Sequence, residues 1–221
     1  MSSNAKFKFL LINSDKFPPF RVDVAVLFGK EFTQKGHVIH WLLQSQADCK
    51  KGYNTSWLGN QVYVGPTDNG TSILSRIKKY LWRSLHGFRV FDLAFRNRYD
   101  FIQVKDLFLP AILAIIVSKL KRIPFYYWLS FPFPESHLFS YESKESKFRI
   151  FHLFNGIFSK LLLYKIILPT ADHIFAQSEQ MKLDLMTEDI PGDKITPIPM
   201  GIEVDDADII TFDKRDVSDN S

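Results

Sequence analysis

Short apolar runs alternate with longer stretches of helical periodicity along this chain. The runs are rich in β-branched and aromatic residues, which favours strands over 7–12, 37–43, 60–64, 100–104, 124–131, 171–177 and 194–199. The stretches between them predict helices over 21–34, 72–98, 107–121, 144–168 and 179–187. The remaining polar and aromatic segment, 133–143, is predicted as a loop.

Strands that alternate with helices imply right-handed βαβ units. We therefore predict an α/β fold, in which a Rossmann-like parallel sheet carries helices on both faces. Apolar residues make up 46% of the chain, which is ordinary for a protein that buries a real core. We assign residues 1–204 to one domain, and the acidic, polar segment 205–221 to a linker or tail.

The charge is distributed unevenly along the chain. From Gly201 onward there are seven acidic and two basic residues, whereas residues 1–200 hold 26 basic and 17 acidic ones. A basic body suggests an anionic partner, which leaves nucleic acid, a phosphorylated substrate and a membrane surface to consider. No base-reading motif is present and the aromatic residues follow core spacing, so no nucleic-acid partner is expected.

Several kinds of site are disfavoured by what the sequence lacks. Cys49 is the only cysteine and the six histidines are scattered, so we expect no disulfide framework and no metal site. Gly-x-Gly, Gly-x-x-x-x-Gly-Lys and Gly-x-Ser-x-Gly are all absent, which argues against a dehydrogenase, a P-loop ATPase and a serine hydrolase. The single cysteine and the lack of a secretory pattern at the start favour a cytoplasmic location.

Two motifs in the last third of the chain carry a resemblance. Residues 171–179 read ADHIFAQSE and residues 195–203 read ITPIPMGIE. Together they resemble the end of the N-terminal domain in family 4 glycosyltransferases of the GT-B fold, although Met200 stands where Asn is usual and Glu203 where Asp is common. Upstream, Lys35-Gly36-His37 and the run from Tyr99 to Val104 agree in order and spacing, so the resemblance spans about residues 7–205.

The resemblance implies one of two Rossmann-like domains that face each other across a cleft. This N-terminal half presents the acceptor, and a C-terminal half binds the nucleotide-sugar without metal or other cofactor. The Glu-x₇-Glu signature of that half is absent, so we expect the donor-binding domain to be missing through truncation, a split gene or a second chain. The expected function is sugar transfer to a glycan or lipid-linked acceptor in polysaccharide or glycolipid biosynthesis. The alternative is a non-catalytic, membrane-bound partner that recruits a separate donor-binding subunit.

Candidate site residues follow from the matched positions. Ser130 stands near the place where many relatives carry a His, and Glu135 and His137 follow it, so these three are the candidate catalytic residues. An ordinary polar loop is the alternative. The candidate substrate-binding residues lie in the first loop and at the two terminal motifs: Ser14, Arg21, Ser178, Glu179 and Gly201. Ser178 begins a helix at a strand's carboxyl end, which suits an anion, but a simple helix cap explains it equally.

Two basic helices with aromatic residues suggest a membrane surface. In 72–98 and 144–168, lysines and arginines are interleaved with Trp, Phe and Leu, a composition that suits an anionic bilayer. The candidate contact residues are Arg76, Lys79, Trp82, Arg83, Arg149 and Lys160. The protein would then be peripheral on the inner face of the membrane. The alternative is that the apolar faces of both helices belong to the core.

Overall fold

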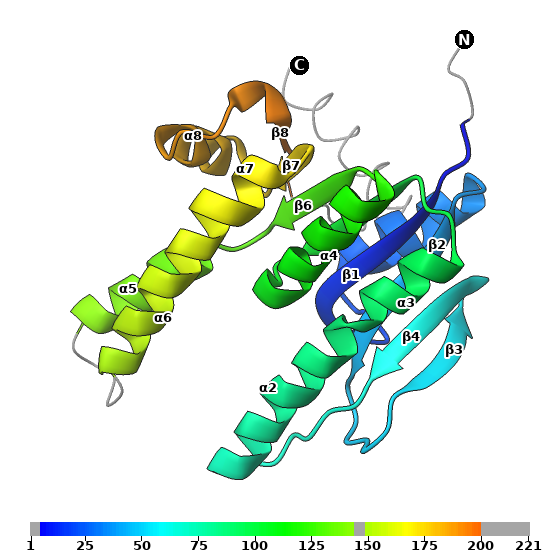
Figure 1. Ribbon diagram of the computed structural model, residues 1–221, viewed down its shortest axis with the longest axis horizontal. Helices are drawn as coiled ribbons and strands as arrows, with labels where there is room; N and C mark the ends of the chain where they lie inside the picture. Colours follow the sequence, from blue (N-terminus) through cyan, green and yellow to red (C-terminus); the bar gives the residue numbers. More distant parts are fainter. Residues whose placement is uncertain (1–4, 144–148, 200–221) are drawn as a thin grey trace, which may run out of the picture.

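A single sheet organises the computed structural model, which describes residues 5–143 and 149–199. In this part of the chain the strand order is β3-β4-β2-β1-β5-β6-β7-β8, and every neighbouring pair is parallel except β3 and β4 (Figure 1). The strands are β1 (Lys8–Phe17), β2 (Val38–Ser45), β3 (Tyr53–Trp57), β4 (Asn60–Gly65), β5 (Phe101–Lys105), β6 (Phe125–Leu129), β7 (His173–Ala176) and β8 (Ile195–Pro197). The predicted α/β fold with a mostly parallel sheet is confirmed.

The helices follow the strands in the order that parallel crossovers require. They are α1 (Val22–Val24), which continues into the π-helical η1 (Ala25–Phe32), then α2 (Ile73–Gly87), α3 (Arg89–Arg96), α4 (Phe108–Lys121), α5 (Phe133–Glu142), α6 (Arg149–Leu162), α8 (Glu179–Thr187) and the short η3 (Gly192–Lys194). The α6 helix runs without interruption through η2 (Leu163–Ile167) and α7 (Leu168–Thr170). In Figure 1, α2 and the α5–α6 pair project beyond the carboxyl ends of the strands.

The core has one cluster on each face of the sheet. Along β1, Leu10 and Ile12 pack into the cluster that α3, α4 and η2 cover, whereas Phe9 and Leu11 pack into the cluster under η1. All four side chains are buried. A strand that is covered on both faces needs apolar residues at consecutive positions, which explains why β1 reads as a continuous apolar run.

The prediction of a loop over 133–143 is wrong, because Phe133–Glu142 form α5. The Pro-Phe-Pro stretch before Glu135 argues for a loop, yet proline is well tolerated in the first turn of a helix, where its missing N–H has no intrahelical partner. The helix is stabilised by its packing on α6. A Cβ atom at Gly156 of α6 would lie 2.8 Å from the Leu138 side chain, so glycine allows this close approach.

The strand β3 was not predicted, since residues around it are rich in Gly, Asn and Ser. It pairs with β4 through a two-residue turn at Leu58 and Gly59, both of which have positive φ (48° and 79°). Positive φ at both turn positions is the geometry that suits a tight hairpin. Pairing across the turn thus overrides a weak strand signal.

Candidate functional site

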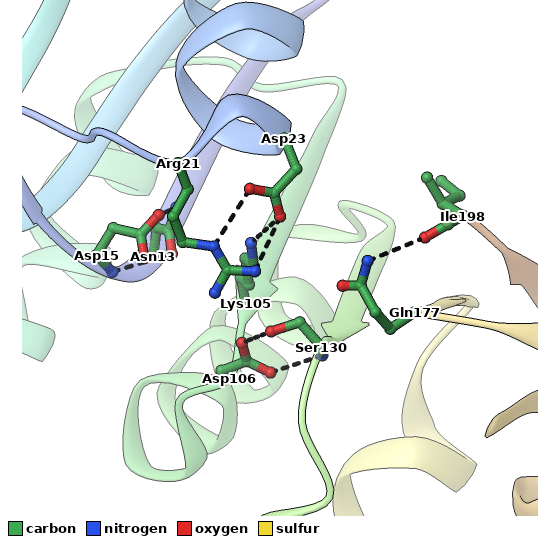
Figure 2. A network of polar contacts seen from close by, with 9 residues as sticks. All are labelled: Asn13, Asp15, Arg21, Asp23, Lys105, Asp106, Ser130, Gln177 and Ile198. Carbon is green, nitrogen blue, oxygen red and sulfur yellow. Dashed lines mark hydrogen bonds and ion pairs between the residues drawn. The ribbon is translucent and has the colours of Figure 1, made fainter. Parts of the chain in front are cut away.

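Polar side chains converge where the central strands end (Figure 2). They come from the ends of four neighbouring parallel strands, so the sheet brings positions from across the sequence to one edge. Around the end of β1 and the start of α1 lie Asn13, Asp15, Arg21 and Asp23; Lys105 ends β5 and Asp106 follows it; Ser130 follows β6, and Gln177 follows β7.

A buried lysine lies at the centre of this cluster. Lys105 is 0% exposed, and its Nζ lies 2.7 Å from Oδ2 of Asp23. The same ammonium lies 3.9 Å from the ring centroid of Trp128. Burial lowers the pKa of Lys105, while the contact with Asp23 opposes that shift. An ion pair of this kind is stable only because both partners are present.

Asp23 binds a second cation, Arg21, which is partly exposed at the surface. The Arg21 guanidinium donates from Nε to Oδ1 of Asp23 at 3.2 Å and from Nη2 to Oδ2 at 3.1 Å. Arg21 retains 27% of its side-chain exposure, whereas Asp23 retains 5%. One carboxylate therefore fixes two cations, and Arg21 is the one that an incoming anion can reach.

Asp106 and Ser130 form the second part of the cluster. The Ser130 backbone N–H donates to Oδ1 of Asp106 at 2.8 Å, and the Ser130 hydroxyl donates to Oδ2. Burial raises the pKa of Asp106, and these two hydrogen bonds oppose the shift. Asp106 adopts φ of 56°, a left-handed conformation that is uncommon outside glycine and that concentrates at functional sites.

Asp15 adds a third carboxyl group near the end of β1. Its backbone N–H donates to Oδ1 of Asn13 at 3.1 Å, and the Asn13 amide donates back to Asp15 at 3.4 Å. Burial raises the pKa of Asp15, while the nearby Lys105 and Arg21 oppose the shift. The cluster therefore places carboxyl groups near Arg21, whose partly exposed guanidinium can contact an anion.

Of the predicted catalytic residues, only Ser130 lies in this cluster. Glu135 points to η2 instead, where its Oε1 accepts the Tyr164 hydroxyl at 2.8 Å. His137 lies beside His152 of α6, with 3.2 Å between their Nδ1 atoms. Because residues 133–142 are helical, these two side chains turn towards α6 and η2 rather than towards Ser130.

The predicted substrate-binding residues have mixed positions. Arg21 belongs to the polar cluster. Ser14 lies next to the cluster in β1, and its carbonyl accepts a hydrogen bond from Nη2 of Arg83 at 3.3 Å. Ser178 caps α8, since its hydroxyl accepts the Met181 N–H at 3.1 Å. Glu179 is exposed in the first turn of that helix, and Gly201 lies outside the described residues.

Next to Ser178, Gln177 contributes a polar group that the sequence did not single out. Its Nε2 donates to the Ile198 carbonyl at 3.4 Å, while its Oε1 is buried with no hydrogen-bond partner in the described part of the chain.

The predicted membrane-contact residues are only partly described. Lys79 is half-buried, and Trp82 has the Lys78 ammonium 4.6 Å from its ring centroid. Lys160 pairs with Glu188 at 2.7 Å. The side chains of Arg76 and Arg149 lie outside the described part of the structure.

Sequence reasoning missed Asp15, Asp23, Lys105 and Asp106. A usable signal exists in hindsight, because Lys105 and Asp106 directly follow an apolar strand of a parallel sheet, the place where ligands bind in this architecture. Among the described residues there is no group of three His, Cys, Asp or Glu arranged to hold a metal ion.

Comparison with known proteins identifies relatives of this chain. A sequence model of Glycosyltransferase Family 4 matches residues 23–206. No protein of curated function matches the chain. Among solved structures, Anabaena HepE in complex with UDP and glucose shares the fold with a TM-score of 0.50 and 14% identity, over 95% of this chain and 50% of HepE.

Two further structures share the fold at the same level. UGT2 of Phytolacca americana in its apo form has a TM-score of 0.50 and 13% identity, over 96% of this chain and 55% of UGT2. The glycotransferase of kitacinnamycin has a TM-score of 0.50 and 10% identity, over 91% of this chain and 53% of that protein. The chain thus spans about half the length of the structures it matches.

Proposed function

Because the chain belongs to Glycosyltransferase Family 4, we propose that it is the acceptor-side half of a sugar-transferring enzyme. The donor is a nucleotide-sugar that a second domain or subunit binds; the HepE structure, which shares the fold, holds UDP and glucose, the two parts of such a donor. The acceptor is a glycan or lipid-linked glycan in polysaccharide or glycolipid biosynthesis. The polar cluster at the carboxyl edge of the sheet carries this proposal, because it places proton-accepting and anion-binding groups side by side.

In the proposed reaction, the acceptor hydroxyl lies beside Ser130 and Asp106. Its oxygen bonds to the anomeric carbon of the donor sugar while the bond from that carbon to the diphosphate oxygen breaks. The diphosphate leaves with the electron pair, and the hydroxyl proton passes to the Asp106 carboxylate. The raised pKa of Asp106 suits it to accept this proton.

Arg21 provides positive charge for the leaving diphosphate. Asp23 holds the guanidinium in place and is itself held by Lys105, so the orientation of Arg21 is fixed before the donor arrives. Preorganised charge of this kind stabilises a developing anion without reorganisation during the reaction. The proposal therefore needs neither a metal ion nor an organic cofactor.

The test measures transfer from radiolabelled UDP-glucose and other UDP-sugars in membranes of cells that express the natural gene with its genomic neighbours. We expect Asp106→Asn to lower kcat by about 10²–10⁴-fold. The matched control is Asp92→Asn, because Asp92 is exposed and pairs with Arg96 on the surface of α3, away from the polar cluster. Transfer that depends on the chain yet is unchanged by Asp106→Asn would refute a catalytic role and would favour the partner-subunit alternative.

We further propose that the protein docks on the inner face of a membrane through two apolar stripes. One stripe lies on α2 and the other on α6, and large apolar residues are exposed at helical spacing along each. The first consists of Leu74, Ile77, Leu81 and Leu85, and the second of Ile150, Phe154, Ile157, Phe158 and Leu161. Both helices project beyond the carboxyl ends of the strands (Figure 1), where the polar cluster lies (Figure 2), so docking would bring a lipid-linked acceptor to it.

The charges beside these stripes suit an anionic lipid surface. Lys78 and Lys79 lie on α2 and an exposed Lys165 follows α6, where each adds attraction to anionic lipid. The helix over His152–Thr170 is long and apolar enough to cross a membrane by length and composition. Its carboxyl half packs into the core through Leu163 and Ile167, which leaves the exposed half for interfacial contact.

Flotation with vesicles that contain phosphatidylglycerol tests the docking proposal. Replacement of Leu81 and Phe158 by Glu is expected to abolish flotation at low salt, because a carboxylate in each stripe opposes burial in an anionic bilayer. Leu183→Glu is the matched control, since Leu183 is 54% exposed on α8 and lies in neither stripe. Wild-type protein that stays at the bottom of the gradient would refute docking.

A further inference from the structure

A cavity of about 240 Å³ lies beside the carboxyl ends of β2 and β4, apart from the polar cluster. Its lining comes from two loops and one turn of α2: Asp48, Cys49, Lys50, Thr67, Asp68, Lys78 and Trp82. Its neighbouring residues contact the carboxyl end of β1, because Lys16 donates to Asn69 at 3.3 Å and Arg83 donates to the Ser14 carbonyl. The cavity and the polar cluster thus lie along the same carboxyl edge of the sheet.

The lining offers hydrogen-bonding groups that the fold does not use up. Asp48 accepts a hydrogen bond from the Asn69 N–H through Oδ1, and the residue is exposed to solvent. Asp68 accepts a hydrogen bond from the Gly70 N–H through Oδ1, and its Oδ2 forms a long ion pair with Lys78 at 3.9 Å, which leaves that oxygen free to accept a hydrogen bond. Thr67 is 1% exposed, and its hydroxyl is buried with no hydrogen-bond partner in the described part of the chain. Buried polar groups without partners are uncommon and point to a missing one.

The charges of the lining balance, since two carboxylates face two lysines. A phosphate or a carboxylate ligand would meet as much repulsion as attraction here, whereas a neutral polyhydroxylated ligand meets acceptors and donors at once. Trp82 adds an aromatic ring to one wall. Aromatic faces carry partial negative charge, and the C–H groups on one side of a sugar ring fit against them.

We propose that this cavity binds one sugar ring of the acceptor, other than the ring that receives the transferred sugar. The inference rests on the proposed function, and it defines the acceptor as a saccharide of two or more residues. Asp48 and Asp68 accept hydrogen bonds from ring hydroxyl groups, and the ring packs against Trp82. Lys78, whose ammonium now lies over that indole, moves aside to donate to a hydroxyl oxygen.

The first experiment is binding of the labelled chain to a printed array of defined mono- to hexasaccharides. We expect saccharides of two or more residues to bind, and Trp82→Ala and Asp68→Asn each to weaken binding about tenfold or more. Tyr53→Ala is the matched control, because Tyr53 is 42% exposed on β3 and does not line the cavity. Asp68→Asn keeps the side-chain shape, so it tests the cavity even if Trp82→Ala fails to fold by circular dichroism.

The result that overturns the inference is an array on which no saccharide binds, or binding that neither Trp82→Ala nor Asp68→Asn weakens. Competition by inorganic phosphate as effective as that by saccharide would also overturn it, since it would identify an anion site.

The transfer assay separates failure of this inference from failure of the proposed function. Trp82→Ala is expected to raise KM for acceptors of two or more sugar residues, with kcat unchanged and short acceptors unaffected. If Asp106→Asn abolishes transfer while Trp82→Ala leaves every KM unchanged, the cavity assignment is wrong and the proposed function stands. If Asp106→Asn has no effect but array binding still needs Trp82, the proposed catalytic role is wrong and the saccharide site stands.

Discussion

Asp23→Ala should be among the most destabilising single changes at this site, because it leaves the buried charge of Lys105 without its partner. The Lys105 ammonium is fully buried, and among the described residues Asp23 is the carboxylate that lies within ion-pair distance of it. Removing one member of a buried ion pair costs about 3–5 kcal/mol of unfolding free energy, because the remaining charge keeps its desolvation penalty. For a chain of this size, each kcal/mol shifts Tm by about 2–4 °C, so we expect Tm to fall by about 6–20 °C.

Urea denaturation followed by tryptophan fluorescence and by far-ultraviolet circular dichroism measures this loss. Trp128 reports directly on the site, since its ring lies beside the Lys105 ammonium. The double variant Asp23→Val with Lys105→Met should regain most of the stability, because it removes both charges and fills the space with apolar groups. The matched control is Asp92→Ala, which breaks an exposed ion pair and should cost less than about 1 kcal/mol.

The reasoning is refuted if Asp23→Ala costs no more than Asp92→Ala. It is also refuted if the double variant is less stable than Asp23→Ala alone, because an unpaired Lys105 charge would then not be the cause of the destabilisation. A double variant that is stable but inactive in the transfer assay would indicate that the pair is retained to position Arg21 rather than to stabilise the fold.

Three further predictions concern stability. Burial lowers the pKa of both His40 and His86 to about 4, so below pH 6.5 the unfolded chain binds protons that the native state does not. The free energy of unfolding should therefore fall as pH drops from 6.5 towards 4, by at most about 3 kcal/mol per histidine. Urea titrations of His86→Gln at several pH values should show a weaker dependence of stability on pH. Gly65→Ala should lower Tm, because the new Cβ would lie 2.5 Å from the His86 ring. Gly87→Ala, at the end of α2, should raise Tm, because its Cβ would meet only ordinary contacts at 3.5 Å and alanine favours the helix. Equal Tm values for the two variants would contradict both expectations. Ser178→Ala should cost about 1 kcal/mol through loss of the α8 cap, and a thermal melt unchanged from wild type would assign the hydroxyl to another role.

Only part of the polar cluster could be predicted from the sequence. Ser130 is predicted from the resemblance, because it stands near the place where many relatives carry a His, and the structure puts it against Asp106. Glu135 and His137 were predicted with it as neighbours in one loop. Helix α5 separates them from the cluster, because packing on α6 outweighs the local preference of a proline-rich segment for a turn.

The amino-acid sequence by itself determined the fold class and the family. Apolar runs and helical periodicity are local properties, so they identify β1 or α4 without knowledge of the rest of the chain. The pairing of Lys105 with Asp23, 82 positions earlier, is not local. It exists because adjacent parallel strands end at one edge of the sheet, and a charge buried there is stable only beside its partner, so only the tertiary structure decided which polar residues form the site.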